Sequence, residues 1–296
     1  MTAAPVFAFS CTACGQCCKH GGPALSIDEV FKYQNTFISG LRWTGHAIPK
    51  KYTITFKGET VDAQKMRNHL ASFAAPSFDD KGDTIQPHIY PMVTGYTLVR
   101  SCNALNADET CSLHADKPTM CRSVPFDPAM PEHMQDIVLR DFEHDCMTET
   151  QAPDAANVIY RDGRITDASC KADYDRRLAV MQKDKSAFAA LSYFMSEKPS
   201  ALAPAMSTFM QMVDRGGWVE TSMLPLLLVL LKNEEITRPV TGNYLHSQIA
   251  LIDTEISAAR ERHHHNERGR TEMMRKYVTS YRKCFDDEGE LVSPSE

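Results

Sequence analysis

Four cysteines within eight residues constrain this chain more than any other feature of its sequence. Cys11, Cys14, Cys17 and Cys18 form two overlapping Cys-x-x-Cys steps. At this spacing one tight turn lets two sulfurs face the same ion, as in structural zinc sites. Gly15 lies inside the run and can supply the positive φ that such a turn needs. The segment is therefore predicted to fold around a bound metal.

The adjacent pair Cys17 and Cys18 argues against a simple zinc knuckle. Side chains of neighbouring residues diverge, so these two thiols are awkward as two ligands of one tetrahedral ion. They are better suited to two metals, or to one cluster and a second partner. We therefore expect a centre that holds more than a single ion.

A second group of cysteines lies further along the chain. Cys102, Cys111 and Cys121 fall within twenty residues, with Pro118 between the last two, and Cys146 follows. With the first group they make eight thiols, more than the four that close a structural zinc site. Eight thiolates could form two four-cysteine sites, one multinuclear centre, or an iron–sulfur cluster beside a separate metal. Counting leaves these three alternatives open.

The cellular compartment decides whether clustered cysteines bind metal or form disulfides. The first basic residue is Lys19, so the N-terminus lacks the positive region and apolar stretch of a secretory signal. The longest strongly apolar run, residues 223–231, is far shorter than the roughly 20 residues that cross a bilayer. We therefore expect a cytoplasmic protein without a membrane partner, in which clustered cysteines are metal ligands or redox groups.

The overall composition narrows the function further. A chain of 296 residues with 43% hydrophobic residues can bury a core without needing metals to fold. Its net charge of -6 is opposite to that of a dedicated nucleic-acid binder, so we expect no nucleic-acid partner. Neither a dinucleotide nor a P-loop motif is present. Gly21 stands where both a radical S-adenosylmethionine motif and a bacterial ferredoxin run would need cysteine.

The residue patterns predict an α+β fold with two domains, a small loop-rich cysteine domain over residues 1–170 and a mostly helical domain over 171–296. In the first half, Ser26 and Glu29 form a capping-box pattern that opens a helix over 27–38. Asp162-Gly163 predicts a two-residue hairpin turn. We expect further strands over 52–56, in parts of 88–100, and over 137–142. In the second half, we expect helices over 171–196, 202–214, 222–235 and 242–283, with Gly269 able to bend the last.

Two sequence motifs together resemble a known family. Cys-x-x-Cys-Gly-x-Cys-Cys and Cys-Ser-Leu-His-x-x-Lys-Pro-x-x-Cys-Arg are similar to the signature of the CxxCxxCC family of zinc- or iron-chelating domains, which includes flagellin lysine methylases. The resemblance covers roughly residues 11–146. It departs at His114 and Lys117-Pro118, where the family usually has tyrosine and arginine-proline. Lysine keeps the charge but loses bidentate hydrogen bonding, and His114 adds a candidate nitrogen ligand.

The resemblance implies a ligand set. It carries Cys11, Cys14, Cys17, Cys18, Cys102, Cys111 and Cys121 over as ligands, and Cys146 matches a later, isolated cysteine of the family. Cys170 is an alternative for the final position. Because ligating thiolates accumulate negative charge, Lys19 and Arg122 are expected to offset that charge and hydrogen-bond the sulfurs.

Three functional hypotheses follow. In the first, the cysteines hold zinc or an iron–sulfur centre, such as 4Fe-4S, in a metal-binding protein of undefined activity. In the second, the resemblance extends to activity, and the protein transfers a methyl group from S-adenosylmethionine to protein lysines presented by the helical half. In the third, the centre is a structural zinc and the helical half binds a partner protein.

The histidine run His263-His264-His265 is a further possible ligand group. On the helix expected there, consecutive residues point about 100° apart and cannot all face one metal. We therefore predict a solvated face of the helix rather than a metal site.

Overall fold

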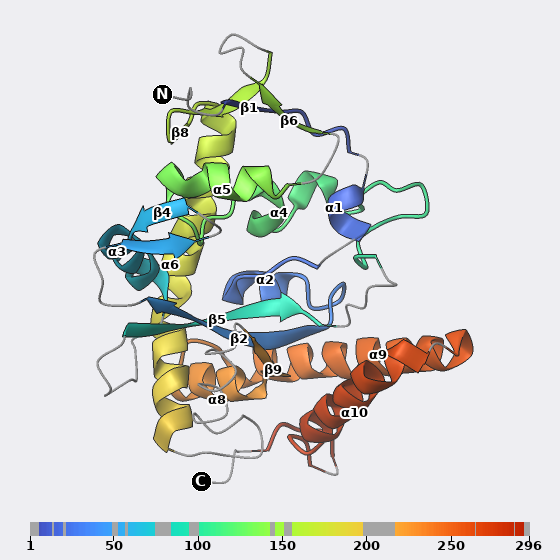
Figure 1. Ribbon diagram of the computed structural model, residues 1–296. Helices are drawn as coiled ribbons and strands as arrows, with labels where there is room; N and C mark the ends of the chain where they lie inside the picture. Colours follow the sequence, from blue (N-terminus) through green and yellow to red (C-terminus); the bar gives the residue numbers. More distant parts are fainter. Residues whose placement is uncertain are drawn as a thin grey trace. The chain divides into compact units, whose positions relative to one another are not determined.

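Short strands dominate the N-terminal region and long helices the C-terminal region, as Figure 1 shows for a computed structural model of the protein. The α+β prediction is confirmed. The structure describes residues 6–13, 15–19, 22–48, 53–56, 59–74, 84–94, 101–142, 146–150, 156–197, 217–263, 265–286 and 288–292. Of the helices in these ranges, none is both long and apolar enough to span a membrane.

The chain divides into two compact units that interleave along the sequence. Unit 1 comprises residues 1–17, 45–88 and 105–185, and unit 2 comprises residues 18–44, 89–104 and 186–296. The units do not follow the predicted division into residues 1–170 and 171–296, which stays a prediction.

Unit 1 contains a four-stranded sheet in the order β6-β1-β7-β8. The strands are β1 (Val6–Phe9), β6 (Met147–Thr150), β7 (Val158–Arg161) and β8 (Arg164–Ile165). β1 pairs antiparallel with both β6 and β7. Asp162 and Gly163 have φ values of 52° and 74° between β7 and β8, which confirms the predicted hairpin.

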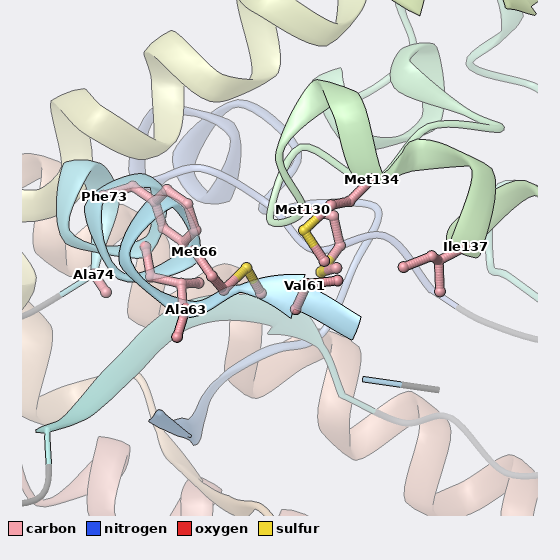
Figure 2. Close-up of a cluster of buried hydrophobic side chains, with 9 residues drawn as sticks. Val61, Ala63, Met66, Phe73, Ala74, Met130, Met134 and Ile137 are labelled. Carbon is pink, nitrogen blue, oxygen red and sulfur yellow. The ribbon is translucent and has the colours of Figure 1, made fainter. Parts of the chain in front are cut away.

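A hydrophobic cluster in unit 1 joins helices α3 (Ala63–Phe73) and α5 (Gln135–Arg140). Figure 2 shows its side chains, among them Met66, Phe73, Met134 and Ile137. The hairpin of β3 (Thr53–Phe56) and β4 (Glu59–Asp62) leads into α3. The strand predicted over 52–56 is thus confirmed.

The strand predicted over residues 137–142 is wrong, because this segment forms α5 after the short 3-10 helix η2 (Glu132–Met134). Met134, Ile137 and Val138 follow the i, i+3, i+4 spacing of one helix face, and all three pack in the hydrophobic cluster. An ion pair of 3.4 Å between Asp136 and Arg140 adds i, i+4 support. Tertiary packing therefore overrides the β-branched composition of the segment.

Helix α6 (Ala168–Glu197) confirms the helix predicted over 171–196. In unit 1 its Tyr174 packs with Phe7, Phe126 and Tyr160 in a second apolar cluster. The Tyr174 hydroxyl also donates a 2.9 Å hydrogen bond to the carbonyl oxygen of Met130. The start of α6 is therefore anchored against the strand β1 that precedes the first cysteine motif.

Unit 2 begins with α2 (Ile27–Lys32), whose N-terminus has the predicted capping box. The Glu29 amide donates to Ser26 Oγ at 3.1 Å, and the Ser26 amide donates to Glu29 Oε2 at 2.8 Å. The helix ends at Lys32 and not at the predicted residue 38. The side-chain amide of Gln248 donates to the carbonyls of Gln34 and Phe37, and so satisfies the backbone of the turn that follows.

A three-stranded sheet has the order β5-β2-β9. Its strands are β2 (Ser39–Ile48), β5 (Thr84–Val93) and β9 (Val219–Ser222). β5 confirms a strand in part of residues 88–100. β2 pairs antiparallel with β9 and places Arg42 opposite Glu220.

The C-terminal helices of unit 2 are α8 (Leu224–Lys232), α9 (Arg238–Arg262) and α10 (Arg268–Arg282). α8 confirms most of the helix predicted over 222–235, and the helix predicted over 202–214 lies outside the described residues. The single helix predicted over 242–283 is wrong. The chain turns at His263, which has a left-handed φ of 53°, and passes through η3 (His265–Glu267) into α10. Gly269 is the second residue of α10, which continues through it without interruption.

Candidate metal centre

The antiparallel pairing of β1 with β6 brings the first cysteine motif beside Cys146. The register pairs Phe9 with Met147. One residue further, the Ser10 amide donates a 3.0 Å hydrogen bond to the carbonyl oxygen of Cys146. Cys11 follows Ser10 directly, so the sheet of unit 1 brings the segments of Cys11 and Cys146 together at one end of the ladder. This proximity favours Cys146 as a member of the ligand set.

The turn of the first motif has the backbone conformation that its glycine predicts. Ala13 and Gly15 have φ values of 55° and 69°. A Cβ atom on Gly15 would lie 2.6 Å from the carbonyl oxygen of Glu109 and 3.0 Å from Leu105 Cδ1. Glycine is therefore required both by the positive φ and by the close approach of the loop that carries Cys111.

The loop that packs on Gly15 is held in shape by its own hydrogen bonds. Leu105 and Cys111 form an isolated antiparallel bridge. Within the loop, the Asn106 amide donates to the Thr110 carbonyl at 2.8 Å, and Thr110 donates its amide and hydroxyl to Asp108. The side-chain and backbone hydrogen bonds from Thr110 lower the pKa of the Asp108 carboxyl. These hydrogen bonds thus fix the conformation of the loop that carries Cys111.

In unit 2, a backbone hydrogen bond joins Cys102 to the first motif. The Cys102 amide donates to the Cys18 carbonyl at 2.7 Å. Cys18 lies on the short helix α1 (Gln16–Lys19), together with Cys17 and Lys19. Consecutive residues of a helix point about 100° apart, which agrees with the expected divergence of Cys17 and Cys18.

The segment between Cys111 and Cys121 is braced by Arg122. It consists of the 3-10 helix η1 (His114–Asp116) and, after Pro118, the helix α4 (Thr119–Ser123). Arg122 Nε donates to the Lys117 carbonyl at 3.1 Å, and its Nη2 donates to the Ala115 carbonyl at 3.2 Å. Arg122 therefore fixes the chain between these cysteines through backbone carbonyls. Its expected hydrogen bonds to thiolates stay a prediction, as does the role of Lys19.

A second arginine anchors α4 in a way that no sequence pattern indicated. Arg177 of α6 is 3% exposed, and its Nη1 donates a 3.1 Å hydrogen bond to Thr119 Oγ1. Thr119 is the first residue of the helix that carries Cys121. The contact holds this part of the second motif against α6 within unit 1.

The cysteines differ in exposure. Cys102 is buried and Cys11 and Cys17 are exposed, and the remaining described ones are half-buried: Cys18, Cys111, Cys121, Cys146, Cys170 and Cys284. His114 is also exposed. Exposed and half-buried thiols remain accessible to a metal, and thiolate sulfur suits zinc and iron–sulfur centres.

The described side chains do not form a complete metal site by themselves. Within them, no three cysteine, histidine, aspartate or glutamate side chains lie where they could share one ion. Cys14 lies outside the described residues. Backbone contacts thus bring the cysteine segments together in pairs, and the eight-cysteine ligand set stays a prediction.

Cys170 has a different environment from the other candidates. It lies in the first turn of α6 and packs against the apolar cluster of Phe7 and Tyr160. Burial, with a hydrogen bond to Asp167, raises the pKa of the Cys170 thiol to about 12. A thiol that resists deprotonation is a poor metal ligand, because metals bind the thiolate. This favours Cys146 over Cys170 as the final ligand.

Comparison with known proteins agrees with these features. Residues 10–147 match the model of the CxxCxxCC family, which is described as a putative zinc- or iron-chelating domain. No curated protein and no solved structure matches the chain. The matched range begins beside Cys11 and ends beside Cys146, the two segments that the β1–β6 ladder joins. Residues 10–147 therefore carry a CxxCxxCC domain.

Proposed function

We propose that the protein binds zinc or an iron–sulfur centre through the eight cysteines of residues 10–147. The main support is the close packing of the loop of Cys111 on the turn at Gly15. A methyl group added to Gly15 would collide with this loop. The hydrogen bonds from Ser10 to Cys146 in unit 1 and from Cys102 to Cys18 in unit 2 each bring a further pair of cysteine segments together. A fold that brings cysteine segments together in pairs from distant parts of the chain supports metal chelation.

The divergence of Cys17 and Cys18 supports a centre with more than one metal, or a cluster beside a separate ion. When bound, iron in such a centre would supply redox chemistry, and zinc would supply a closed structural site. A thiol-rich site is stable as thiolates in a reducing compartment, so the proposal includes a cytoplasmic location.

Anaerobic purification, followed by metal analysis and a visible spectrum, tests this proposal. Stoichiometric iron with a visible chromophore that is lost in the Cys17→Ser and Cys18→Ser variants would identify an iron–sulfur centre. Colourless protein with one or two zinc ions would identify zinc chelation. Anaerobically purified protein that holds neither metal, and takes up neither on reconstitution, would refute chelation.

Lysine methylation is a second candidate, supported by the resemblance of the two motifs to those of flagellin lysine methylases. It requires an iron–sulfur centre, a bound S-adenosylmethionine and a protein substrate at the helical half. Equilibrium dialysis of the metal-loaded protein with S-adenosylmethionine tests it. Absence of saturable S-adenosylmethionine binding would rule out methyl transfer and would not affect the proposal of metal chelation. If metal analysis finds zinc and no iron, a structural zinc centre with a partner-binding helical half is favoured instead.

A further inference from the structure

A basic pocket lies in unit 2 where α9 ends and α10 begins. It has a volume of about 360 Å³, and it is lined by the side chains of Arg260, His263, His265, Glu267, Arg268 and Arg275. None of these residues belongs to the proposed ligand set. The pocket therefore needs an explanation of its own.

The turn at His263 builds this pocket. Because the chain adopts a left-handed conformation there, α10 folds back and packs along α9. Arg268, Thr271 and Arg275 follow the spacing i, i+3 and i+7, so they share one face of α10. All three line the pocket, together with Arg260 and His263 from the end of α9. His263 and His265 thus lie in the connection between α9 and α10 and not on one face of a long helix.

The acidic residues around the pocket are already engaged by other arginines. Arg262 Nη2 contacts Glu255 Oε1 at 2.9 Å and Glu267 Oε2 at 2.8 Å, and its Nε donates to both oxygens of Glu267. Arg270 adds a second ion pair to Glu255 at 3.8 Å. Glu267, the one acid that lines the pocket, is thereby neutralised by a residue outside the lining.

In the part of the chain that the structure describes, no carboxylate forms such an ion pair with the lining arginines Arg260, Arg268 and Arg275. Nearby on α10, Lys276 does pair with Glu272 at 3.2 Å. Three guanidinium groups around one pocket repel each other, in a chain whose net charge is -6. An anion bound among them would offset this repulsion.

We propose that this pocket binds a phosphate-bearing ligand. Guanidinium groups match the oxygens of a phosphate in bidentate geometry and keep their charge at any physiological pH. The volume exceeds what one inorganic phosphate fills and lies within the range of small-molecule sites, so a diphosphate or a phosphorylated small molecule fits best. The imidazoles of His263 and His265 can donate further hydrogen bonds.

Calorimetric titration of the full, metal-loaded chain with inorganic pyrophosphate at low ionic strength tests the proposal. We expect saturable binding of pyrophosphate by the native protein. The affinity should fall about tenfold in the Arg275→Gln variant and about tenfold in the Arg268→Gln variant, since each loses a charge-assisted contact. Lys276→Gln is the matched control. It removes the same charge one residue further along α10, outside the pocket, and should leave the affinity unchanged.

A second titration arm distinguishes a free phosphate from a lipid headgroup. It measures co-sedimentation with phosphatidylcholine vesicles that contain phosphatidic acid. Arginine-dependent binding in either arm supports the pocket and identifies the source of the phosphate. The proposal is overturned if neither probe binds the native protein, or if Lys276→Gln weakens binding as much as Arg275→Gln. Far-ultraviolet circular dichroism of each variant checks that α10 remains folded.

Discussion

The amide of Cys102 donates a 2.7 Å hydrogen bond to the carbonyl oxygen of Cys18, so a backbone contact joins Cys102 to the end of the first cysteine motif. A similar bond joins Ser10 to Cys146. Neither contact uses a thiol. Substituting serine for a cysteine should therefore remove a metal ligand without removing the contact that positions its segment, which makes such variants informative about binding.

The first prediction separates Cys146 from Cys170. We expect Cys146→Ser to lower metal retention against a competing chelator roughly tenfold or more, because even residues that only support ligands have effects of about 10–100-fold. Cys170→Ser should retain metal like the native protein, since its thiol is packed on an apolar cluster and has a raised pKa. Metal analysis after dialysis against chelator measures both. Equal loss in the two variants would contradict the assignment.

The second prediction concerns Gly15. Alanine there must adopt a φ of 69° and would place its Cβ 2.6 Å from the Glu109 carbonyl oxygen. The left-handed conformation alone costs about 1–2 kcal/mol. We expect Gly15→Ala to lower the free energy of unfolding by about 2 kcal/mol or more, and to lower metal retention as the loop of Cys111 shifts.

Gly242→Ala is the control for Gly15→Ala. Gly242 lies within α9, and a Cβ atom added there meets no atom within 4 Å. Alanine in a helix interior is favoured over glycine by about 1 kcal/mol, so this variant should be more stable than the native protein. Urea titrations of both variants would show opposite shifts. A Gly15→Ala protein as stable as the native one would mean that the loop can move away at little cost.

The third prediction concerns the capping box of α2. Ser26 is 4% exposed, and its hydroxyl accepts from the Glu29 amide. Ser26→Ala should lower the free energy of unfolding by about 1 kcal/mol, because one orphan amide loses its acceptor. Ser257→Ala removes an exposed hydroxyl within α9 that donates to the Asp253 carbonyl, and it should have almost no effect. Comparing the thermal unfolding of the Ser26→Ala and Ser257→Ala variants measures the contribution of the N-cap hydrogen bond.

Local signals predicted the parts of the fold that depend on few residues. The start of α2 is determined by Ser26 and Glu29, and the β7–β8 turn by Asp162 and Gly163. The end of α2 was not predictable in this way. The chain turns after Lys32, and Gln248, which is distant in sequence, satisfies the carbonyls of Gln34 and Phe37 in that turn. A turn that is held by a distant side chain leaves no local pattern.

The same distinction applies to the candidate site. The motif spacing indicated which cysteines are candidate ligands, and it predicted the positive φ of Gly15. The contacts that position their segments involve Ser10, Glu109 and the Arg177–Thr119 pair, none of which is a specified residue of either motif. Ordinary residue types in contact across long sequence separations carry no readable spacing, so they become visible only in the folded chain.

The last prediction is a pH dependence that arises from Glu220. This residue lies on β9 opposite Arg42, and burial raises the pKa of its carboxyl to about 7 although Arg42 and Arg270 oppose the shift. The unfolded chain releases this proton near pH 4.5, whereas the folded chain keeps it to about pH 7. Because the folded state binds more protons between these values, Glu220 stabilises the fold at low pH and loses that contribution as the pH rises through 7.

We therefore expect Glu220→Gln to remove part of the pH dependence of stability. The glutamine amide stays neutral, so the variant should be more stable relative to the native protein at pH 8 than at pH 5, with the difference changing by up to about 3 kcal/mol. Urea titrations of both proteins at the two pH values measure it. Metal binding also depends on pH, but both proteins retain the cysteines, so this effect cancels in the comparison. A difference independent of pH would mean that the Glu220 carboxyl is already ionised well below pH 7 in the folded protein.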